Sequence, residues 1–272
     1  MQIEKQLQDL TRLQWSRIRH SSGTAGSFLK AQEEIDGVKM YYKLSNYNIV
    51  EGIIGHECVN EILVDRLLDY LNFPHLQYRL IHAKILVNTK EYITYICASE
   101  DYKEKGESKT AMDLFYEMEM KKGETPYDFC QRMGWEEQVI QMLTIDYLIL
   151  NRDRHGANIE VLRNRNKKTT RLAPLFDHGL SLVFQCLDDN ALERIDVLED
   201  KVVQAFLGTH SVAKNLQLIP MEKRIKLPSF DETFHKNLFA DLEGIISKQR
   251  MDKIWEMITK RADQYENISN QR

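Results

Sequence analysis

The sequence predicts an α+β fold in which roughly the first hundred residues are rich in β-strands and the remainder is mostly helical. Three observations support this prediction. Residues with β propensity flank Asp36-Gly37, a dipeptide typical of tight hairpin turns. Two further β-rich runs follow at 77–88 and 92–99. The stretch 136–150 is strongly apolar and has the length of a buried helix.

The N-terminal elements are expected in the order helix, loop, hairpin and helix. Apolar residues at helical spacing predict a helix over about 2–19, and a cluster of small residues predicts a loop at 21–28. The hairpin strands are predicted at 28–34 and 38–44. Apolar positions then recur every three or four residues, which indicates an amphipathic helix over 56–71.

The remainder of the chain contains fewer strand signals. Thr125-Pro126 is a typical helix start and precedes the apolar helix described above. Two short strands are predicted at 159–163 and 170–176, around a polar turn, and helices resume after about Asp188.

A charged stretch near 99–106 separates the β-rich part from the helical part. We therefore place a boundary between residues 99 and 100. Region 1–99 would hold the loop, hairpin, helix and strands, and region 100–272 the helices and the polar motifs discussed next.

Composition excludes several classes of protein. The formal net charge is -4 and the sequence pI about 6.1, so no overall basic field favours direct binding to nucleic acid or to an anionic membrane. No apolar run has the length of a membrane span and no apolar leader opens the chain, so a cytoplasmic location is expected. The cysteines form no CxxC pair, which argues against a structural zinc site and a disulfide framework; they are Cys58, Cys97, Cys130 and Cys186.

Two motifs contain residues suited to phosphoryl transfer. In NRDRHGAN, Asp153 and Asn158 have the D-x-x-x-x-N spacing of a catalytic loop. Asp177 opens the downstream sequence DHG, which fits a metal-binding D-x-G. Such a reaction needs a carboxylate near the attacking hydroxyl and hard oxygen ligands that hold magnesium on the phosphates. The alternative is that both aspartates are turn or cap residues, but the two motifs in this order favour catalysis.

The N-terminal region supplies complementary candidates. Lys43 ends the second hairpin strand, where a lysine can reach phosphates while a helix carboxylate holds it. Glu61 is the candidate partner, although Glu57 lies one turn earlier on the same face and stays open as an alternative. The loop SSGTAGSF offers amides and little side-chain bulk, and lacks the ending of a Walker A loop. Its candidate phosphate contacts are Ser22, Gly23, Thr24, Ala25, Gly26 and Ser27.

NRDRHGAN, the later APLFDHGLSL and the Ser/Gly loop before a hairpin together resemble the HipA-like serine/threonine protein kinases. The resemblance spans roughly residues 15–215 and is closest to the compact, kinase-core members of that family. It implies a two-lobed protein-kinase-like fold, with a small β-rich N-lobe and a larger helical C-lobe, and the use of ATP and Mg²⁺. The chain shows no APE segment, so activation-loop rules of eukaryotic kinases are not carried over.

The resemblance also implies a role for each residue of the two motifs. Asp153 would be the catalytic base, Asn158 and Asp177 the magnesium ligands, and Lys43 the phosphate-binding lysine. His155 would organise the catalytic loop, which we favour over a role in acid-base catalysis.

Two further features follow from the resemblance. A hinge segment would hold adenine through its main chain, and by position this segment is Ile96, Cys97, Ala98 and Ser99. Autophosphorylation in the Ser/Gly loop would repel ATP from the same cradle. Ser22 is the preferred acceptor and Ser21 and Ser27 are the others, the alternative being that these serines only suit a turn.

Three functions therefore stay open. A serine/threonine protein kinase is favoured, and it would act on a protein substrate; an antitoxin partner is implied only by analogy with the toxins of the family. A kinase of lipid or small-molecule hydroxyls is the second, because phosphoinositide kinases use a similar loop. It is expected to have a basic membrane-facing segment, and the dense basic runs, 163–168 and 223–226, are short. The third is a catalytically silent module that binds a nucleotide or a partner.

Overall fold

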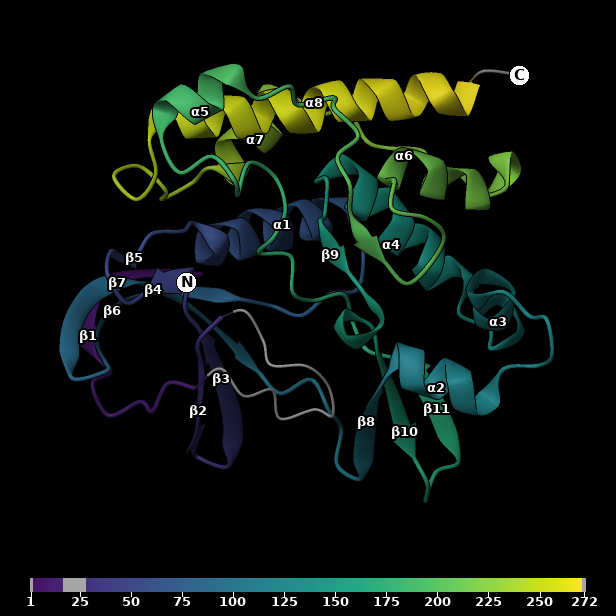
Figure 1. Ribbon diagram of the computed structural model, residues 1–272, viewed down its shortest axis with the longest axis horizontal. Coiled ribbons are helices and arrows are strands. Elements are labelled where there is room, and N and C mark those ends of the chain that lie inside the picture. Colours follow the sequence, from purple (N-terminus) through teal and green to yellow (C-terminus); the bar gives the residue numbers. More distant parts are fainter. Residues whose placement is uncertain (1, 17–27, 271–272) are drawn as a thin grey trace.

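The computed structural model describes residues 2–16 and 28–270. Its N-terminal part is a five-stranded sheet with the strand order β1-β6-β7-β3-β2 (Figure 1). β1 and β6 are parallel, and the other neighbours are antiparallel. The strands are β1 (Ile3–Asp9), β2 (Lys30–Ile35), β3 (Val38–Lys43), β6 (Arg79–Val87) and β7 (Lys90–Glu100).

The predicted hairpin and the helix that follows it are confirmed. Asp36 and Gly37 both have positive φ, of 50° and 78°, and form the two-residue turn between β2 and β3. A short ladder of β4 (Tyr47–Asn48) and β5 (Gly52–Ile53) then leads to α1 (Glu57–Leu71), which packs on β6 and β7. The left-handed Asn72 ends this helix, with φ at 55°.

The predicted helix over 2–19 is wrong for the part that the structure describes. Residues Ile3–Asp9 form β1, and Ile3 is buried where it pairs with Leu80 of β6. The apolar spacing matched a helix, but the edge of β6 offers main-chain partners at both ends of the segment, and such tertiary pairing overrides a weak local preference. Leu10 and Leu13 are buried against the sheet after the strand has ended.

Helices dominate the C-terminal part, as predicted. α3 begins at Pro126, with the Thr125 side chain accepting a hydrogen bond from the amide of Asp128, and the apolar helix is α4. In Figure 1, α8 lies at the top, above α1 and α4. The helices are α2 (Met112–Glu119), α3 (Pro126–Arg132), α4 (Glu136–Leu148), α5 (Asp189–Arg194), α6 (Val212–Asn215), α7 (Glu232–Leu238) and α8 (Lys248–Asn270), with 3₁₀ turns η1 (Gly156–Asn158), η2 (Leu216–Leu218) and η3 (Met221–Lys223).

Small sheets carry the polar motifs of this part. The predicted strand pair is present as β10 (Glu160–Asn164) and β11 (Thr169–Leu172). The sequence did not predict β8 (Glu107–Ala111), which directly follows the charged stretch and pairs with β10. A short parallel ladder joins β9 (Asp153–Arg154) to β12 (Gln204–Ala205).

These elements confirm the predicted α+β fold, with a sheet-rich N-terminal part and a helical C-terminal part. One large apolar cluster joins α1 to α4 and the C-terminal helices, and a smaller one covers the opposite face of the five-stranded sheet. Within the described ranges, no helix combines the length and apolar character needed to cross a lipid bilayer.

Candidate active site

A cleft lies between the five-stranded sheet and the polar motifs of the C-terminal part. Residues of β2, β3 and β7 line one side, and residues of η1, β10 and the segment before DHG line the other. The cleft encloses about 930 Å³, counting the open space at its mouth, which suits a small-molecule ligand. Lys43, Asn158 and Asp177, which are far apart in the sequence, all line it.

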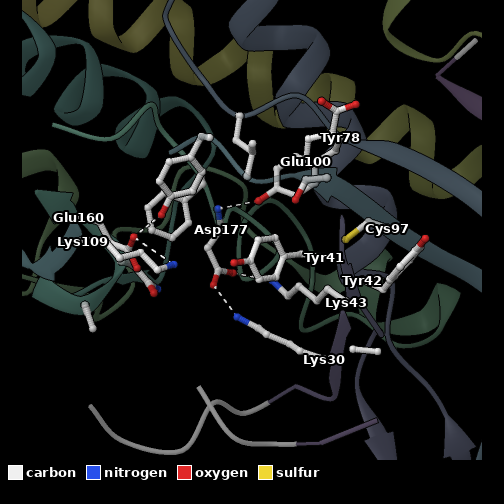
Figure 2. A pocket seen from close by; sticks show the side chains of 17 residues that line it. Lys30, Tyr41, Tyr42, Lys43, Tyr78, Cys97, Glu100, Lys109, Glu160 and Asp177 are labelled. Atoms are coloured by element: carbon white, nitrogen blue, oxygen red, sulfur yellow. Dashed lines mark hydrogen bonds and ion pairs between the residues drawn. The ribbon is translucent and has the colours of Figure 1, made fainter. Parts of the chain in front are cut away.

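Lys43 lies at the inner end of this cleft and contacts two carboxylates. Its Nζ is 2.8 Å from Oε1 of Glu61 and 2.5 Å from Oδ1 of Asp177, and Figure 2 shows Lys43 and Asp177 directed toward one another. Burial alone would lower the pKa of Lys43, but the carboxylates of Asp177 and Glu61 raise it well above its ordinary value. The lysine is therefore a fixed positive charge.

Of the two candidate glutamates on α1, Glu61 contacts Lys43 and Glu57 does not. Glu61 is fully buried and also accepts hydrogen bonds from the amides of His178 (2.8 Å) and Gly179 (3.0 Å). Burial raises the pKa of Glu61, while Lys43 and the amide of His178 oppose this shift. Glu57 instead accepts a hydrogen bond from the amide of Asn46 at 3.0 Å. Two similar positions on one helix face thus have different partners.

The main chain of the DHG segment is tightly constrained. Asp177 has a φ of 58°, a left-handed conformation that is uncommon outside glycine. A Cβ at Gly179 would lie 3.1 Å from Nζ of Lys43 and 3.2 Å from Oε1 of Glu61, so only glycine fits beside this ion pair without displacement. The amide group of Asn60 on α1 donates to the carbonyl of Gly179 at 3.0 Å, which adds a second link between α1 and this segment.

His178 points away from solvent and stays neutral. Burial, with help from the nearby guanidinium of Arg154, lowers the pKa of His178 well below its ordinary value. Its Nε2 is buried without a hydrogen-bond partner among the described residues. Protonation of this ring would place an uncompensated charge in the interior.

The predicted catalytic loop holds Asp153, His155 and Asn158 together. The Asn158 side-chain amide donates to the carbonyl of Asp153 at 2.7 Å and to its Oδ2 at 3.2 Å. His155 accepts a hydrogen bond from the amide of Ala157 on Nδ1 at 3.1 Å, and its Nε2 is 3.4 Å from Oδ1 of Asp153. With Nδ1 accepting, the ring proton lies on Nε2 and faces the carboxylate of Asp153.

A buried ion pair beneath the loop was missed by the sequence analysis. The guanidinium of Arg154 contacts Asp146 of α4 at 2.9 Å. It also donates to the carbonyls of Asn158 (3.2 Å) and Phe176 (3.1 Å), so one side chain connects the predicted catalytic loop to the segment before Asp177. The signal available in the sequence was an aspartate inside an otherwise apolar helix, since a buried carboxylate needs a partner.

Lys30 is a second missed residue. Its Nζ is 3.6 Å from Oδ2 of Asp177, and it lines the cleft beside Lys43 (Figure 2). The register of the β2–β3 hairpin pairs Lys30 with Lys43. Because a two-residue Asp36-Gly37 turn dictates that register, this neighbour could have been found from the sequence.

The structure places the predicted hinge residues differently from one another. Ile96 and Ala98 are buried in the smaller apolar cluster and do not line the cleft, whereas Cys97 and Ser99 do. Ile96, Cys97 and Ala98 belong to the part of β7 where the main chain pairs with β6 and β3. Beyond the predicted segment, Glu100 and Tyr102 also line the cleft, so the end of β7 is better placed than its middle to contact a base.

The predicted phosphate loop and its acceptor serines lie outside the described residues. This applies to every position from residue 21 to residue 27, that is Ser21, Ser22, Gly23, Thr24, Ala25, Gly26 and Ser27. Phe28, the first residue described after them, has its ring centroid 4.9 Å from Nζ of Lys43, so Phe28 lies next to the inner end of the cleft.

No protein-family model matches the chain, and no curated protein matches its sequence. Among solved structures, it is similar to the proinflammatory kinase CtkA of Helicobacter pylori, with a TM-score of 0.61 and 15% sequence identity. The similarity covers 97% of this chain and 99% of CtkA. At this identity it is the fold that is shared. The chain therefore has a two-lobed, kinase-like fold, with the cleft described above between its two parts.

Proposed function

We propose that the chain is an ATP- and magnesium-dependent serine/threonine protein kinase of the HipA-like type. The observation that carries the proposal is the convergence of Lys43, Asn158 and Asp177 on one cleft, with Lys43 held by a helix carboxylate. Asp153 lies next to this set, because its carboxylate accepts a hydrogen bond from the side chain of Asn158. Phosphoryl transfer depends mostly on positioning and charge stabilisation, and this arrangement supplies both.

The donor set fits a magnesium ion. Asp177 offers a carboxylate and Asn158 a side-chain carbonyl, the hard oxygen ligands that Mg²⁺ prefers. Lys30 and Lys43 lie against the carboxylate of Asp177, which shows that this corner of the cleft stabilises closely spaced opposite charges. A bound magnesium ion would neutralise the phosphate charge during transfer.

The residues of the chain perform the remaining tasks. Lys43 would bind the phosphates from a position held by Glu61, with Lys30 as a further cation beside it. Asp153 would accept the proton of a serine or threonine hydroxyl as that oxygen attacks the γ-phosphorus, and the P–O bond to ADP breaks. His155 would hold the carboxylate of Asp153 through its Nε2–H. The main chain at the end of β7 would bind adenine.

Intact-protein mass spectrometry after incubation with magnesium and ATP tests this proposal. The wild type, Asp153→Asn and Asp252→Asn are compared, each with a generic protein acceptor. Asp252 is an exposed aspartate on α8, so its variant makes the same chemical change away from the cleft. A phosphate added by the wild type and Asp252→Asn, and absent with Asp153→Asn, is the expected result.

Other outcomes identify the alternatives. Equal transfer by Asp153→Asn would show that Asp153 is not the base. If no protein gains phosphate although ATP binds, phosphorylation of lipid or small-molecule hydroxyls is tested next, and failure of both leaves the silent nucleotide-binding module. Autophosphorylation of Ser22, Ser21 or Ser27 stays a prediction from the sequence, which peptide mapping of the same samples would test.

A further inference from the structure

The end of the cleft remote from Lys43 contains a second pair of charges, in which the carboxylate is buried and the ammonium is partly exposed. Lys109 of β8 lies with its Nζ 3.4 Å from Oε2 of Glu160 on β10, and the hydroxyl of Tyr102 donates to the same oxygen. All three side chains line the cleft. Figure 2 shows Lys109 and Glu160 together on one side of Asp177, with Lys43 and Cys97 on the other.

Aromatic rings surround this pair. Tyr102 stacks on Phe176, with ring centroids 5.8 Å apart. The ammonium of Lys109 is 5.6 Å from the ring centre of Tyr102 and 5.8 Å from that of Tyr41, so it lies between two aromatic faces. A flat heterocycle entering here would find rings to stack on and charged groups at its edge.

A purely structural role explains the pair poorly. The side chain of Glu160 is only 6% exposed and that of Lys109 is 23% exposed. Burying such a pair costs about as much in desolvation as the attraction returns, so apolar residues would serve stability equally well. Burial and the carboxylate of Glu160 raise the pKa of Tyr102, which therefore keeps the proton that it donates. The hydrogen-bonding directions of the cluster are thus defined.

We propose that Lys109 and Glu160 read the base of the nucleotide and allow the cleft to bind GTP as well as ATP. An ammonium beside a carboxylate offers a donor next to an acceptor. Guanine presents O6 beside N1–H, so O6 would meet Lys109 and N1–H would meet Glu160. Adenine presents the reverse order, N6–H beside N1, and is also served by the main chain at the end of β7. The inference rests on the proposed function, because it concerns the base of the same nucleotide.

Calorimetric titration with the magnesium complexes of the β,γ-imido analogues of ATP and GTP tests this inference without turnover. In the wild type, the Kd values for the two analogues should agree within about tenfold. The reason is that contacts of guanine with Lys109 and Glu160 offset the main-chain contacts that favour adenine. A GTP analogue that binds more than about tenfold weaker than the ATP analogue overturns the proposal.

Two variants test whether Lys109 and Glu160 determine the relative affinity for the two analogues. Lys109→Met and Glu160→Gln should each raise the ratio of the Kd for the GTP analogue to that for the ATP analogue roughly tenfold, since Lys109→Met removes the donor to guanine O6 and Glu160→Gln removes the negative charge that accepts guanine N1–H, whereas adenine keeps its main-chain contacts. Lys105→Met removes the same charge from an exposed position on the same segment and should leave the ratio unchanged. A merely structural role would weaken both nucleotides together. An unchanged ratio in both variants contradicts the proposal, whereas a wild type that binds neither analogue contradicts the proposed function itself.

Discussion

The cleft holds two lysine–glutamate pairs that differ in what else the glutamate contacts. At the inner end, Glu61 is tied by two main-chain amides to the DHG segment. At the outer end, Glu160 contacts the side chains of Tyr102 and Lys109. Main-chain partners cannot leave without moving the backbone, whereas side chains can rotate. The inner pair therefore couples α1 to the DHG segment, and the outer pair is able to adapt to a ligand.

The largest effect is expected when the inner lysine is removed. Lys43→Met leaves the carboxylates of Glu61 and Asp177 without their shared cation. We expect phosphate transfer to fall roughly 1,000-fold and the free energy of unfolding to fall by about 3 to 5 kcal/mol. Lys109→Met, by contrast, should change the free energy of unfolding by about 1 kcal/mol or less, because its ammonium is partly exposed. Urea denaturation measures the free energy of unfolding of the two variants, and a transfer assay measures their activity. Equal destabilisation by Lys43→Met and Lys109→Met would contradict the distinction between the two pairs.

The second effect concerns the Arg154–Asp146 ion pair under the predicted catalytic loop. Arg154→Met leaves Asp146 charged and buried, and also deprives the carbonyls of Asn158 and Phe176 of their donor. The free energy of unfolding should fall by about 3 to 5 kcal/mol, as measured by urea denaturation. The double variant that also carries Asp146→Leu should recover part of this loss, because it removes the unpaired charge. No recovery would mean that the two carbonyls, and not Asp146, account for the loss.

A smaller effect should separate the two glutamates of α1. Glu61→Gln removes the charge that holds Lys43, and it keeps an acceptor oxygen for only one of the two amides, because His178 donates to Oε2 and Gly179 to Oε1. The value of kcat/KM should therefore fall roughly 100-fold through misplacement of the lysine. Glu57→Gln makes the same change one turn earlier, and its effect on kcat/KM should stay small because Glu57 bonds only the amide of Asn46 among its described contacts. Steady-state kinetics on both variants decide this, and similar losses would show that the contact to Lys43 is not what matters.

The smallest effect is a dependence of stability on pH. The folded pKa of His178 lies well below 6.5, so the unfolded chain takes up a proton that the folded chain does not as the pH falls below this value. The stabilisation from neutral His178 is therefore complete above pH 6.5 and is lost on acidification. His75, whose pKa is raised despite its burial, mainly by the nearby carboxylate of Asp65, contributes with the opposite sign.

Comparison of the wild type with His178→Gln isolates the contribution of His178 to the pH dependence of stability. Urea denaturation at neutral pH and at mildly acidic pH should show a steeper loss of stability in the wild type than in the variant. Parallel pH profiles would indicate that His178 titrates normally and is not held neutral by its surroundings.

Local signals in the sequence predicted much of the fold. Asp36-Gly37 predicted the β2–β3 hairpin because only a few dipeptides accept two positive φ angles. The apolar periodicity before Asn72 predicted α1, because a helix of that length must bury one face. The same reasoning was wrong for the first segment, where the edge of β6, some seventy residues away in the sequence, supplied the hydrogen bonds.

The sequence by itself determined the spacing of Asp153 and Asn158, because both belong to one short loop, and the register that pairs Lys30 with Lys43, because a two-residue turn permits one register. Only the tertiary structure decided between Glu57 and Glu61. Both lie on the same face of α1 at the same helical spacing, and nothing local distinguishes them. The choice depends on amides of the DHG segment more than a hundred residues later, which contact Glu61 because the packing of α1 brings them there.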